Sequence, residues 1–182
     1  MSCTALTRGR SIDCRTSTGG VKAIYLAPLS AATLVVSGGE VTDFDLNPAD
    51  LFKYEFKRGL TSVTETIVGS TENGSIYYTP SVNMKLHKLT KEDQNEIKLL
   101  ASQRLLVFAE LNSQDGGKNQ ILCLGRNNGL ELNSGTASSG TSLGDMSGYD
   151  FTLDGMEADP MVLVAPYSTV PFDNADFTVT VS

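Results

Sequence analysis

The sequence predicts a mainly β protein, an antiparallel β-sandwich or barrel that carries one α-helix. Apolar and polar residues alternate along several short segments, and such alternation is typical of antiparallel strands with one face on a core. A single segment, residues 90–103, has helical spacing instead. The 182 residues, of which 40% are hydrophobic, suffice for one domain spanning 1–182.

Four segments show the alternation, and each is expected to form a strand with one buried face. Their apolar members are Phe52, Tyr54 and Phe56; Val82, Met84 and Leu86; Tyr149, Phe151 and Leu153; and Phe177, Val179 and Val181. Residues 105–109 and 121–124 are apolar at every position, so both of their faces should be covered. We expect these two runs to form a hairpin across a long turn at 112–119, covered by the helix that precedes them.

The helix is predicted from its N-terminal cap and its apolar stripe. Thr90 is a favourable N-cap residue, and Asp93 follows it at the spacing of a capping box. The residues that follow the helical spacing form a narrow stripe, which consists of Ile97, Leu100 and Ala101.

A long hairpin is predicted within residues 51–88. Residues 60–68 are β-rich but polar on much of both faces, an Asn-Gly pair at 73–74 is a strong reversal signal, and residues 75–79 form the returning strand. Pro80 then suggests an edge or a bulge. Strands of this composition are not covered by their own domain, so we expect them to pair with partner chains.

Two further segments are predicted to be irregular. Residues 134–144 are rich in Gly, Ser and Thr and lack apolar periodicity, which predicts a mobile loop. Residues 1–15 are expected to form an N-terminal arm with a local basic excess from Arg8, Arg10 and Arg15. Such an arm suits an acidic neighbour, although an ordinary solvated arm explains the same charges.

Composition argues against several classes of protein. The net charge of −7 opposes a long-lived complex with nucleic-acid phosphates. No run of about 18 apolar residues occurs, so no membrane span is expected, and no apolar leader segment is visible. The single histidine, His87, and three cysteines are scattered, which argues against a zinc site. Cys123 is interpreted as a small buried hydrophobe, whereas Cys3 and Cys14 are either reduced thiols or a pair.

No catalytic or cofactor-binding group is predicted. His87 has no signature of an activated Ser or Cys nearby, so it is interpreted as a solvent-facing residue. Asp154, Glu157 and Asp159 lie close together, but their spacing is not that of an EF-hand, and a solvated turn is favoured over a cation site. We therefore expect the protein to be no enzyme and to use no metal or cofactor.

Several stretches together resemble one family. Residues 51–86, 88–93 and 105–110 follow the order of a long hairpin, a lone helix and a buried hairpin, and this order resembles the core of bacteriophage tail tube (major tail) proteins. Segments in the second half, together with the Gly/Ser/Thr loop, look similar to structural proteins of tailed phages: 128–132, 145–149 and 155–160.

The resemblance implies a structural virion protein, assembled in the host cytoplasm, that polymerises into the phage tail. In that family, subunits form rings, commonly hexameric, whose hairpins pair side by side into a barrel. Rings stack, and phage DNA is ejected through the lumen without specific binding. Partners are then further copies of the chain and other tail proteins. Residues 61–68 and 75–79 become strands that neighbouring copies complete.

The resemblance also assigns candidate residues. Glu65 and the hydroxyl groups of Ser62, Thr64 and Thr66 are candidates for a polar lumen. The inter-subunit candidates on the returning strand are Ile76, Tyr77 and Tyr78. The candidates for contacts between rings are Arg8, Arg10 and Arg15 and the loop 134–144.

Two other functions remain open from the sequence. The first is a phage head decoration or capsid-auxiliary protein, which would attach to a shell and would not polymerise by itself. The second is a ligand-binding or carbohydrate-binding β-sandwich, in which Tyr77, Tyr78 and Tyr149 would be stacking platforms.

Overall fold

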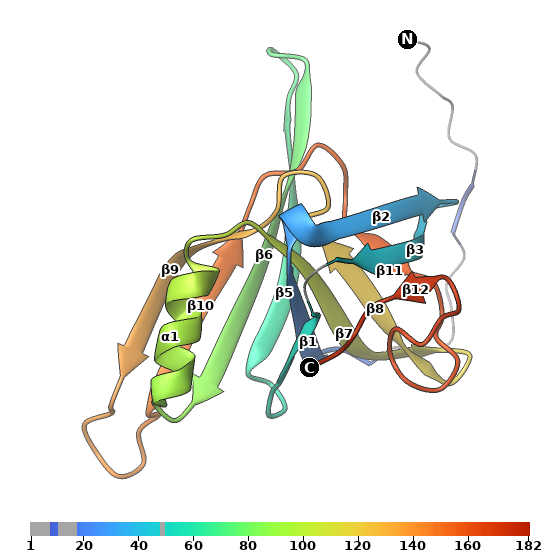
Figure 1. Ribbon diagram of the computed structural model, residues 1–182. Coiled ribbons are helices and arrows are strands. Elements are labelled where there is room, and N and C mark those ends of the chain that lie inside the picture. The colour runs from blue at the N-terminus through green and yellow to red at the C-terminus, as the bar shows by residue number, and fades with distance from the viewer. Residues whose placement is uncertain (1–7, 11–17, 48–49) are drawn as a thin grey trace.

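The computed structural model describes residues 8–10, 18–47 and 50–182. Within these residues it shows a mainly β protein with one short α-helix and two sheets, one of eight mixed strands and one of four antiparallel strands (Figure 1). The predicted β class with a single helix is therefore confirmed. The expectation of antiparallel sheets is only partly correct, because the larger sheet also contains parallel pairs.

The larger sheet runs in the order β12-β3-β11-β8-β7-β1-β4, and β2 also pairs with β3. Its strands are β1 (Val21–Pro28), β2 (Ala32–Ser37), β3 (Glu40–Leu46), β4 (Phe52–Glu55), β7 (Leu105–Asp115), β8 (Lys118–Leu124), β11 (Val162–Val164) and β12 (Phe177–Thr178). A short 3-10 turn, Leu29–Ala31, joins β1 to β2. Strand β3 is parallel to both β11 and β12.

The smaller sheet has the order β5-β6-β10-β9, with every neighbouring pair antiparallel. Its strands are β5 (Thr61–Ser70), β6 (Ser75–His87), β9 (Glu131–Ser138) and β10 (Gly148–Asp154). The β5–β6 hairpin extends beyond the rest of the molecule at one end, and the β9–β10 connection extends at the opposite end (Figure 1). The predicted hairpin is confirmed for β5 and β6, but β4 belongs to the other sheet.

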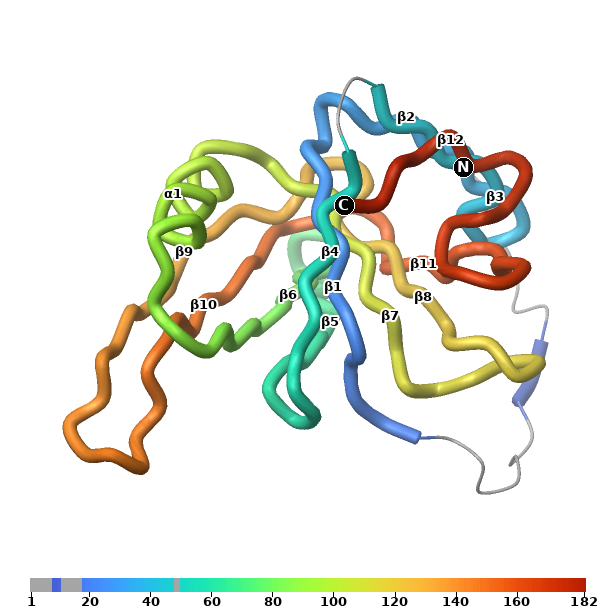
Figure 2. The backbone as a smooth tube through the Cα atoms, turned by 60° about the horizontal axis from the view of Figure 1, so that its bottom comes forward, coloured from blue at the N-terminus to red at the C-terminus, as the bar shows by residue number. Residues whose placement is uncertain are grey.

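Strands β1 and β7 lie between two hydrophobic cores. On one face, Ile24 and Val107 pack with Met84 and Phe151 of the smaller sheet. On the other face, Tyr25, Phe108 and the chain around β3 form the second core, which consists of Ala23, Tyr25, Ala27, Val41, Phe44, Leu46, Leu51, Leu106, Phe108, Ile121, Cys123, Val162, Val164 and Phe172. Figure 2 shows β1 and β7 in the middle, with β9 and β10 to one side and β3 and β11 to the other. Burial on both faces explains the continuously apolar run of β7.

The prediction of what covers the apolar strand β7 is only partly correct. Both faces are covered, as predicted, but a sheet covers the face that was assigned to the helix. Helix α1 (Lys91–Leu100) contributes only the half-buried Ile97 and Leu100. A ten-residue helix with few apolar positions has too little apolar surface to cover a sheet by itself.

The predicted start of the helix is confirmed, and its predicted end is three residues too long. Thr90 Oγ1 accepts the N–H of Asp93 at 3.1 Å and donates to Asp93 Oδ2 at 2.5 Å. Asp93 thus bonds the capping hydroxyl, whereas a capping-box Glu would reach back to the backbone N–H. Leu100 is the last helical residue, and Ala101, placed in the apolar stripe, is exposed.

Two predicted loops are largely strands. The expected long turn at 112–119 is a two-residue connection between β7 and β8, with Gly116 and Gly117 at φ of 59° and 80°. Two successive positive φ values match the twist of a hairpin and favour glycine. The first half of the predicted mobile loop, 134–138, belongs to β9. Composition misled here because Ser and Thr also suit the solvent face of a strand.

Other strand predictions failed as well. Strands β1, β2 and β3 were missed, although residues 23–27 in β1 are apolar at every position, as in β7. The predicted strand around Phe177 is reduced to β12 and an isolated bridge from Val181 to Leu51. Pro80 marks neither a free edge nor a bulge, since it pairs with Glu65 in an unbroken register and accepts from Gly155 N at 3.3 Å.

Candidate functional site

The smaller sheet has two strand edges without a partner among the described residues. Strand β5 pairs only with β6, and β9 pairs only with β10. Both edge strands are long, at ten and eight residues. An unpaired edge presents a row of backbone donors and acceptors to which another strand can bind.

The hydrogen-bond pattern of the smaller sheet shows which backbone groups lie at the free edges. Tyr78 N donates to Glu157 O at 2.9 Å, and Glu157 N donates to Tyr78 O at 2.8 Å, so both groups of Tyr78 point away from β5. The backbone N–H and C=O groups of successive residues in a strand point to opposite sides. Those of Thr79 therefore point toward β5, where Thr79 pairs with Thr66. The N–H groups of the odd-numbered residues of β5 consequently point to the free edge. The same alternation, continued through β10, points the N–H groups of Gly135 and Ala137 to the free edge of β9.

The face of this sheet that points away from the larger sheet is polar. None of its central residues is buried; they are Ser62, Thr64 and Thr66 on β5, Ser81, Asn83 and Lys85 on β6, Asp150, Thr152 and Asp154 on β10, and Ser134, Thr136 and Ser138 on β9. We call this surface the outer face. It offers hydroxyl, amide and carboxylate groups and a single lysine.

Neighbouring side chains hold the outer face in place. Asn83 Nδ2 donates to Asp150 Oδ1 at 2.9 Å and to Thr152 Oγ1 at 3.2 Å. Lys85 Nζ lies 3.1 Å from Asp150 Oδ2. Partial burial opposes the ionised form of Asp150, but the hydrogen bond from Asn83 and the charge of Lys85 outweigh it and lower its pKa. The face is therefore ordered and nearly neutral at its centre.

The opposite, inner face of the sheet is apolar and continues past the core. Val82 and Met84 are fully buried against the larger sheet. Further along the same face, Ile67 and Ile76 are 65% and 61% exposed. Tyr78, opposite Ile67, shares this face. The projecting part of the hairpin thus keeps core-type side chains where its own chain does not cover them.

The candidate residues of the sequence analysis divide between the two faces. Ser62, Thr64, Thr66 and Tyr77 lie on the outer face. Glu65 does not join them, and its assignment to the same surface is wrong. A strand alternates its side chains, so Glu65 lies on the inner face with Ile76 and Tyr78, and its Oε2 accepts from Met161 N at 2.6 Å.

The other candidates are less informative. Arg8 and Arg10 are exposed, and Arg15, Cys3 and Cys14 lie outside the described residues. The three tyrosines of the ligand-binding alternative form no common platform, because Tyr77 and Tyr78 point to opposite faces. Tyr149 is 9% exposed, and its hydroxyl lies 3.5 Å from Thr90 O.

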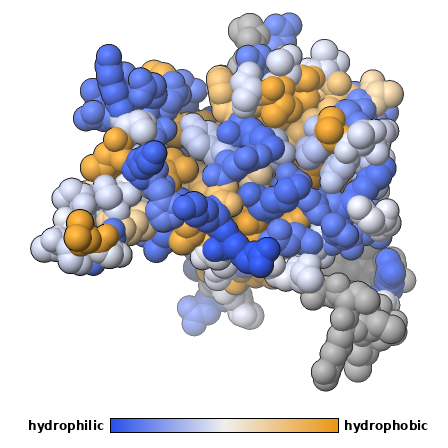
Figure 3. All heavy atoms as spheres, turned by 90° about the horizontal axis from the view of Figure 1, so that it is seen from below, coloured by the Kyte–Doolittle hydropathy of each residue, from blue (hydrophilic) through white to orange (hydrophobic). Residues whose placement is uncertain are grey.

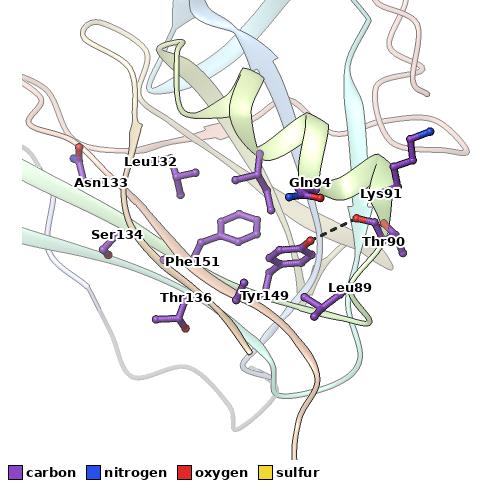
Figure 4. A pocket seen from close by; sticks show the side chains of 13 residues that line it. Leu89, Thr90, Lys91, Gln94, Leu132, Asn133, Ser134, Thr136, Tyr149 and Phe151 are labelled. Carbon is purple, nitrogen blue, oxygen red and sulfur yellow. Dashed lines mark hydrogen bonds between the residues drawn. The ribbon is translucent and has the colours of Figure 1, made fainter. Parts of the chain in front are cut away.

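A groove of about 700 Å³ lies between α1 and the free edge strand β9. Tyr149 and Phe151 point into it, with Gln94 of α1 on one side and Leu132 of β9 on the other (Figure 4). Gly135 contributes no side chain, and a Cβ there would approach Phe151 Cβ to 2.9 Å. The groove is therefore a hollow on the inner face with both apolar and polar lining residues, open beside an unpaired strand.

Glu157 is a residue whose role the sequence analysis missed. The sequence favoured a solvated turn over a cation site at this position, yet Glu157 is 3% exposed. Its carboxylate accepts three backbone N–H groups, from Asn127 at 3.1 Å, Asn128 at 2.9 Å and Gly129 at 3.0 Å. The partners lie 28 to 30 residues away in the chain, so no local pattern identifies them.

A second buried acid, Glu110, lies in the larger sheet, away from the free edges. It accepts from Lys22 Nζ at 2.8 Å, Tyr25 Oη at 2.9 Å and Asn119 Nδ2 at 2.6 Å. Burial works against its ionised form, but the hydrogen bonds from Lys22, Asn119 and Tyr25 outweigh burial and lower the pKa of Glu110. The group is fully partnered and serves the fold.

The described residues contain no group of three His, Cys, Asp or Glu residues arranged to hold a metal ion. Within the same residues, no helix is long and apolar enough to cross a membrane. Cys123 is buried as predicted, and burial raises the pKa of its thiol to about 12. His87 is exposed.

Comparison with known proteins returned no match to any protein-family model, to any curated protein or to any solved structure.

Proposed function

We propose that the protein is a phage tail tube subunit whose copies join edge to edge, β5 to β9, into rings that stack into a conduit for DNA. The observation that supports this best is the four-stranded sheet with two free edges and one uncovered polar face. The features that follow, strand direction, stagger and surface chemistry, all fit closure of this sheet by copies of the same chain.

Strand direction permits the closure. Along the order β5-β6-β10-β9 every step is antiparallel, so β9 runs opposite to β5. Rotation about a ring axis keeps these directions, and the β5 of the next copy therefore meets β9 antiparallel. A closed ring of such sheets has no open edge, which removes a surface that otherwise leads to uncontrolled aggregation.

The stagger of the two edges also fits a barrel. Ser134 stands in one row with Thr152, Asn83 and Ser62, so the middle of β9 is level with the start of β5. Along the strand direction, the middle of β9 is offset from the middle of β5 by about four residues, or roughly 13 Å. The four strands of the sheet together are about 19 Å wide. Tilting the strands by roughly 35° brings the two edges level, and barrels are typically tilted by about 35–45°.

In that arrangement the free backbone groups meet in register. Val63 of one copy lies opposite Ala137 of the next, and Glu65 lies opposite Gly135. These residues have their N–H groups at the free edges of β5 and β9, and all four lie on the inner face. The pairing therefore satisfies backbone groups and keeps the apolar faces on one side.

In the proposed ring, the position of the larger sheet favours the outer face as the lining of the hole. Each copy carries its bulk on the inner face, and only the convex side of a ring has room for it. The outer face then lines the lumen with Ser62, Thr64 and Thr66 and few charges. A lumen without a basic lining lets DNA pass without retaining its phosphates.

The test is the assembly of the purified full-length chain, followed by negative-stain microscopy and light scattering. Rings or tubes of the unchanged protein support the proposal, whereas a monomer at all concentrations overturns it. Ala137→Pro removes one donor of the free β9 edge and should leave folded monomers, since a proline fits an edge position with an outward N–H. Ala137→Ser keeps the donor and should assemble. A trimer that binds only phage heads would favour the decoration protein.

A further inference from the structure

We infer that the groove between α1 and β9 is the socket for a neighbouring copy, and that Ile67 of that copy is its apolar anchor. The inference rests on the proposed ring and adds the contact that gives the β5–β9 joint its hydrophobic core. The socket is lined by residues of three elements, among them Ile97 of α1, Leu132 of β9 and Phe151 of β10.

The proposed register between β5 and β9 identifies the residue of the neighbouring copy that enters the groove. With Glu65 opposite Gly135, Ile67 of the neighbour lies two residues further along β5 and faces Asn133, beside Leu132. Ile67 projects from the inner face, which is the face that holds the groove. It is 65% exposed in the single chain and lies on the free edge strand, so its own domain does not compete for it.

Shape and charge agree with this occupant. Gly135 and Ala137 are the smallest residues of the groove lining, so no long side chain from these two positions of β9 covers the groove. Glu65 enters the same side of the joint as Ile67, and its Oε1 has no hydrogen bond among the described residues. Lys91 and Gln94 line the groove and offer a cation and an amide to this carboxylate. The groove therefore accepts one apolar and one acidic side chain from the same strand.

A matched residue separates this contact from general stickiness of the hairpin. Ile76 is 61% exposed, shares the inner face and stands on β6, one strand away from the edge. It does not line the joint. If the groove is the socket, a charge at Ile67 disrupts the ring and the same charge at Ile76 does not.

The experiment compares assembly of the full chain carrying Ile67→Asp, Ile67→Leu or Ile76→Asp by light scattering and microscopy. We expect Ile67→Asp to weaken the association at each joint by at least about tenfold, because it removes a buried isoleucine from every interface. Ile67→Leu and Ile76→Asp should assemble like the unchanged chain. Melting temperatures of the monomers should agree, since both isoleucines are exposed there.

The outcomes distinguish the two proposals. Unchanged protein that never forms rings overturns the proposed function. Unchanged protein that forms rings while Ile67→Asp forms them equally well overturns the socket alone, and the groove would then serve another ligand. Loss of rings in both Asp variants also overturns the socket, because it would show a requirement for the whole apolar hairpin end.

Discussion

Glu157 and Gly129 are joined across two loops, because Glu157 Oε1 accepts the Gly129 N–H at 3.0 Å and Glu157 is only 3% exposed. The same oxygen accepts Asn128 N, and Oε2 accepts Asn127 N. The backbone of Glu157 pairs with Tyr78 of β6. Glu157 thus connects the loop after β8 to β6 of the smaller sheet. Strand β6 is the neighbour of β5, which carries one of the two free edges.

Replacing Glu157 by Ala should reduce the free energy of unfolding by about 2–4 kcal/mol, because three backbone donors lose a buried acceptor. Glu157→Gln should cost less, since one oxygen remains. Denaturant unfolding of the monomer measures both. Asp159→Asn is the control, because the side chain of Asp159 is 54% exposed and its ion pair with Arg126 should contribute within about 1 kcal/mol. Equal losses in Glu157→Ala and Asp159→Asn would contradict this role.

Glu110 should make stability depend on pH in the acidic range. Its pKa is lowered in the folded protein, so its stabilising contribution is complete above the ordinary carboxyl pKa and is lost as the pH falls through the lowered value. Glu110→Gln removes this contribution. The difference in unfolding free energy between the two proteins should be largest near neutral pH and shrink toward low pH. A difference that stays constant from neutral to strongly acidic pH would rule out the ionised Glu110.

Phe172 combines a buried ring with an unfavourable backbone. Its φ is 66°, and its ring lies 5.0 Å from that of Tyr25 and 5.1 Å from that of Phe108. Phe172→Ala should cost about 3–5 kcal/mol of stability. Phe172→Gly should be at least as stable as Phe172→Ala, the reverse of the usual order, because glycine adopts this φ without strain. Thermal and denaturant unfolding decide the order.

In the proposed tube, Leu143 should control how one ring stacks on the next. It is fully exposed in the β9–β10 connection, at the end of the sheet opposite the β5–β6 hairpin end, and Figure 3 shows a hydrophobic spot on that lobe. Leu143→Ser should shorten tubes seen by microscopy without reducing ring formation, and should change monomer stability by less than about 0.5 kcal/mol. Val35→Ser, also at an exposed apolar residue, is the control. Tubes of unchanged length in Leu143→Ser would exclude this contact.

In the proposed tubes, thiol reagents can measure whether the outer face lines the lumen. In a Cys3→Ser, Cys14→Ser background, Thr64→Cys should react with a small maleimide and not with a maleimide carried by a large protein. Cys123 is buried and its thiol pKa is raised to about 12, so it should stay silent. In dissociated monomers Thr64→Cys should react with both reagents. Reaction with the large reagent in tubes would place this face outside.

Local patterns predicted the parts of the fold that depend on local physics. The alternation of Tyr149, Phe151 and Leu153 indicated a strand with one buried face, and the structure buries all three. The cap at Thr90 was predicted because a hydroxyl and a following N–H suffice to form it. The chain reversal before β6 was predicted from an Asn-Gly pair, because turn formation also depends on residues that are neighbours in the chain.

The sequence by itself thus determined the β class, the single helix and the long hairpin, because side-chain alternation, capping and turn chemistry act between residues close in the chain. Tertiary structure alone decided that a sheet, and not α1, covers β7, and that residues 134–138 form an edge strand. It also decided that the Glu65 side of β5, and not the Thr64 side, faces the core. These features depend on pairing between segments far apart in sequence, and the energy of such pairing has no signature in either segment alone.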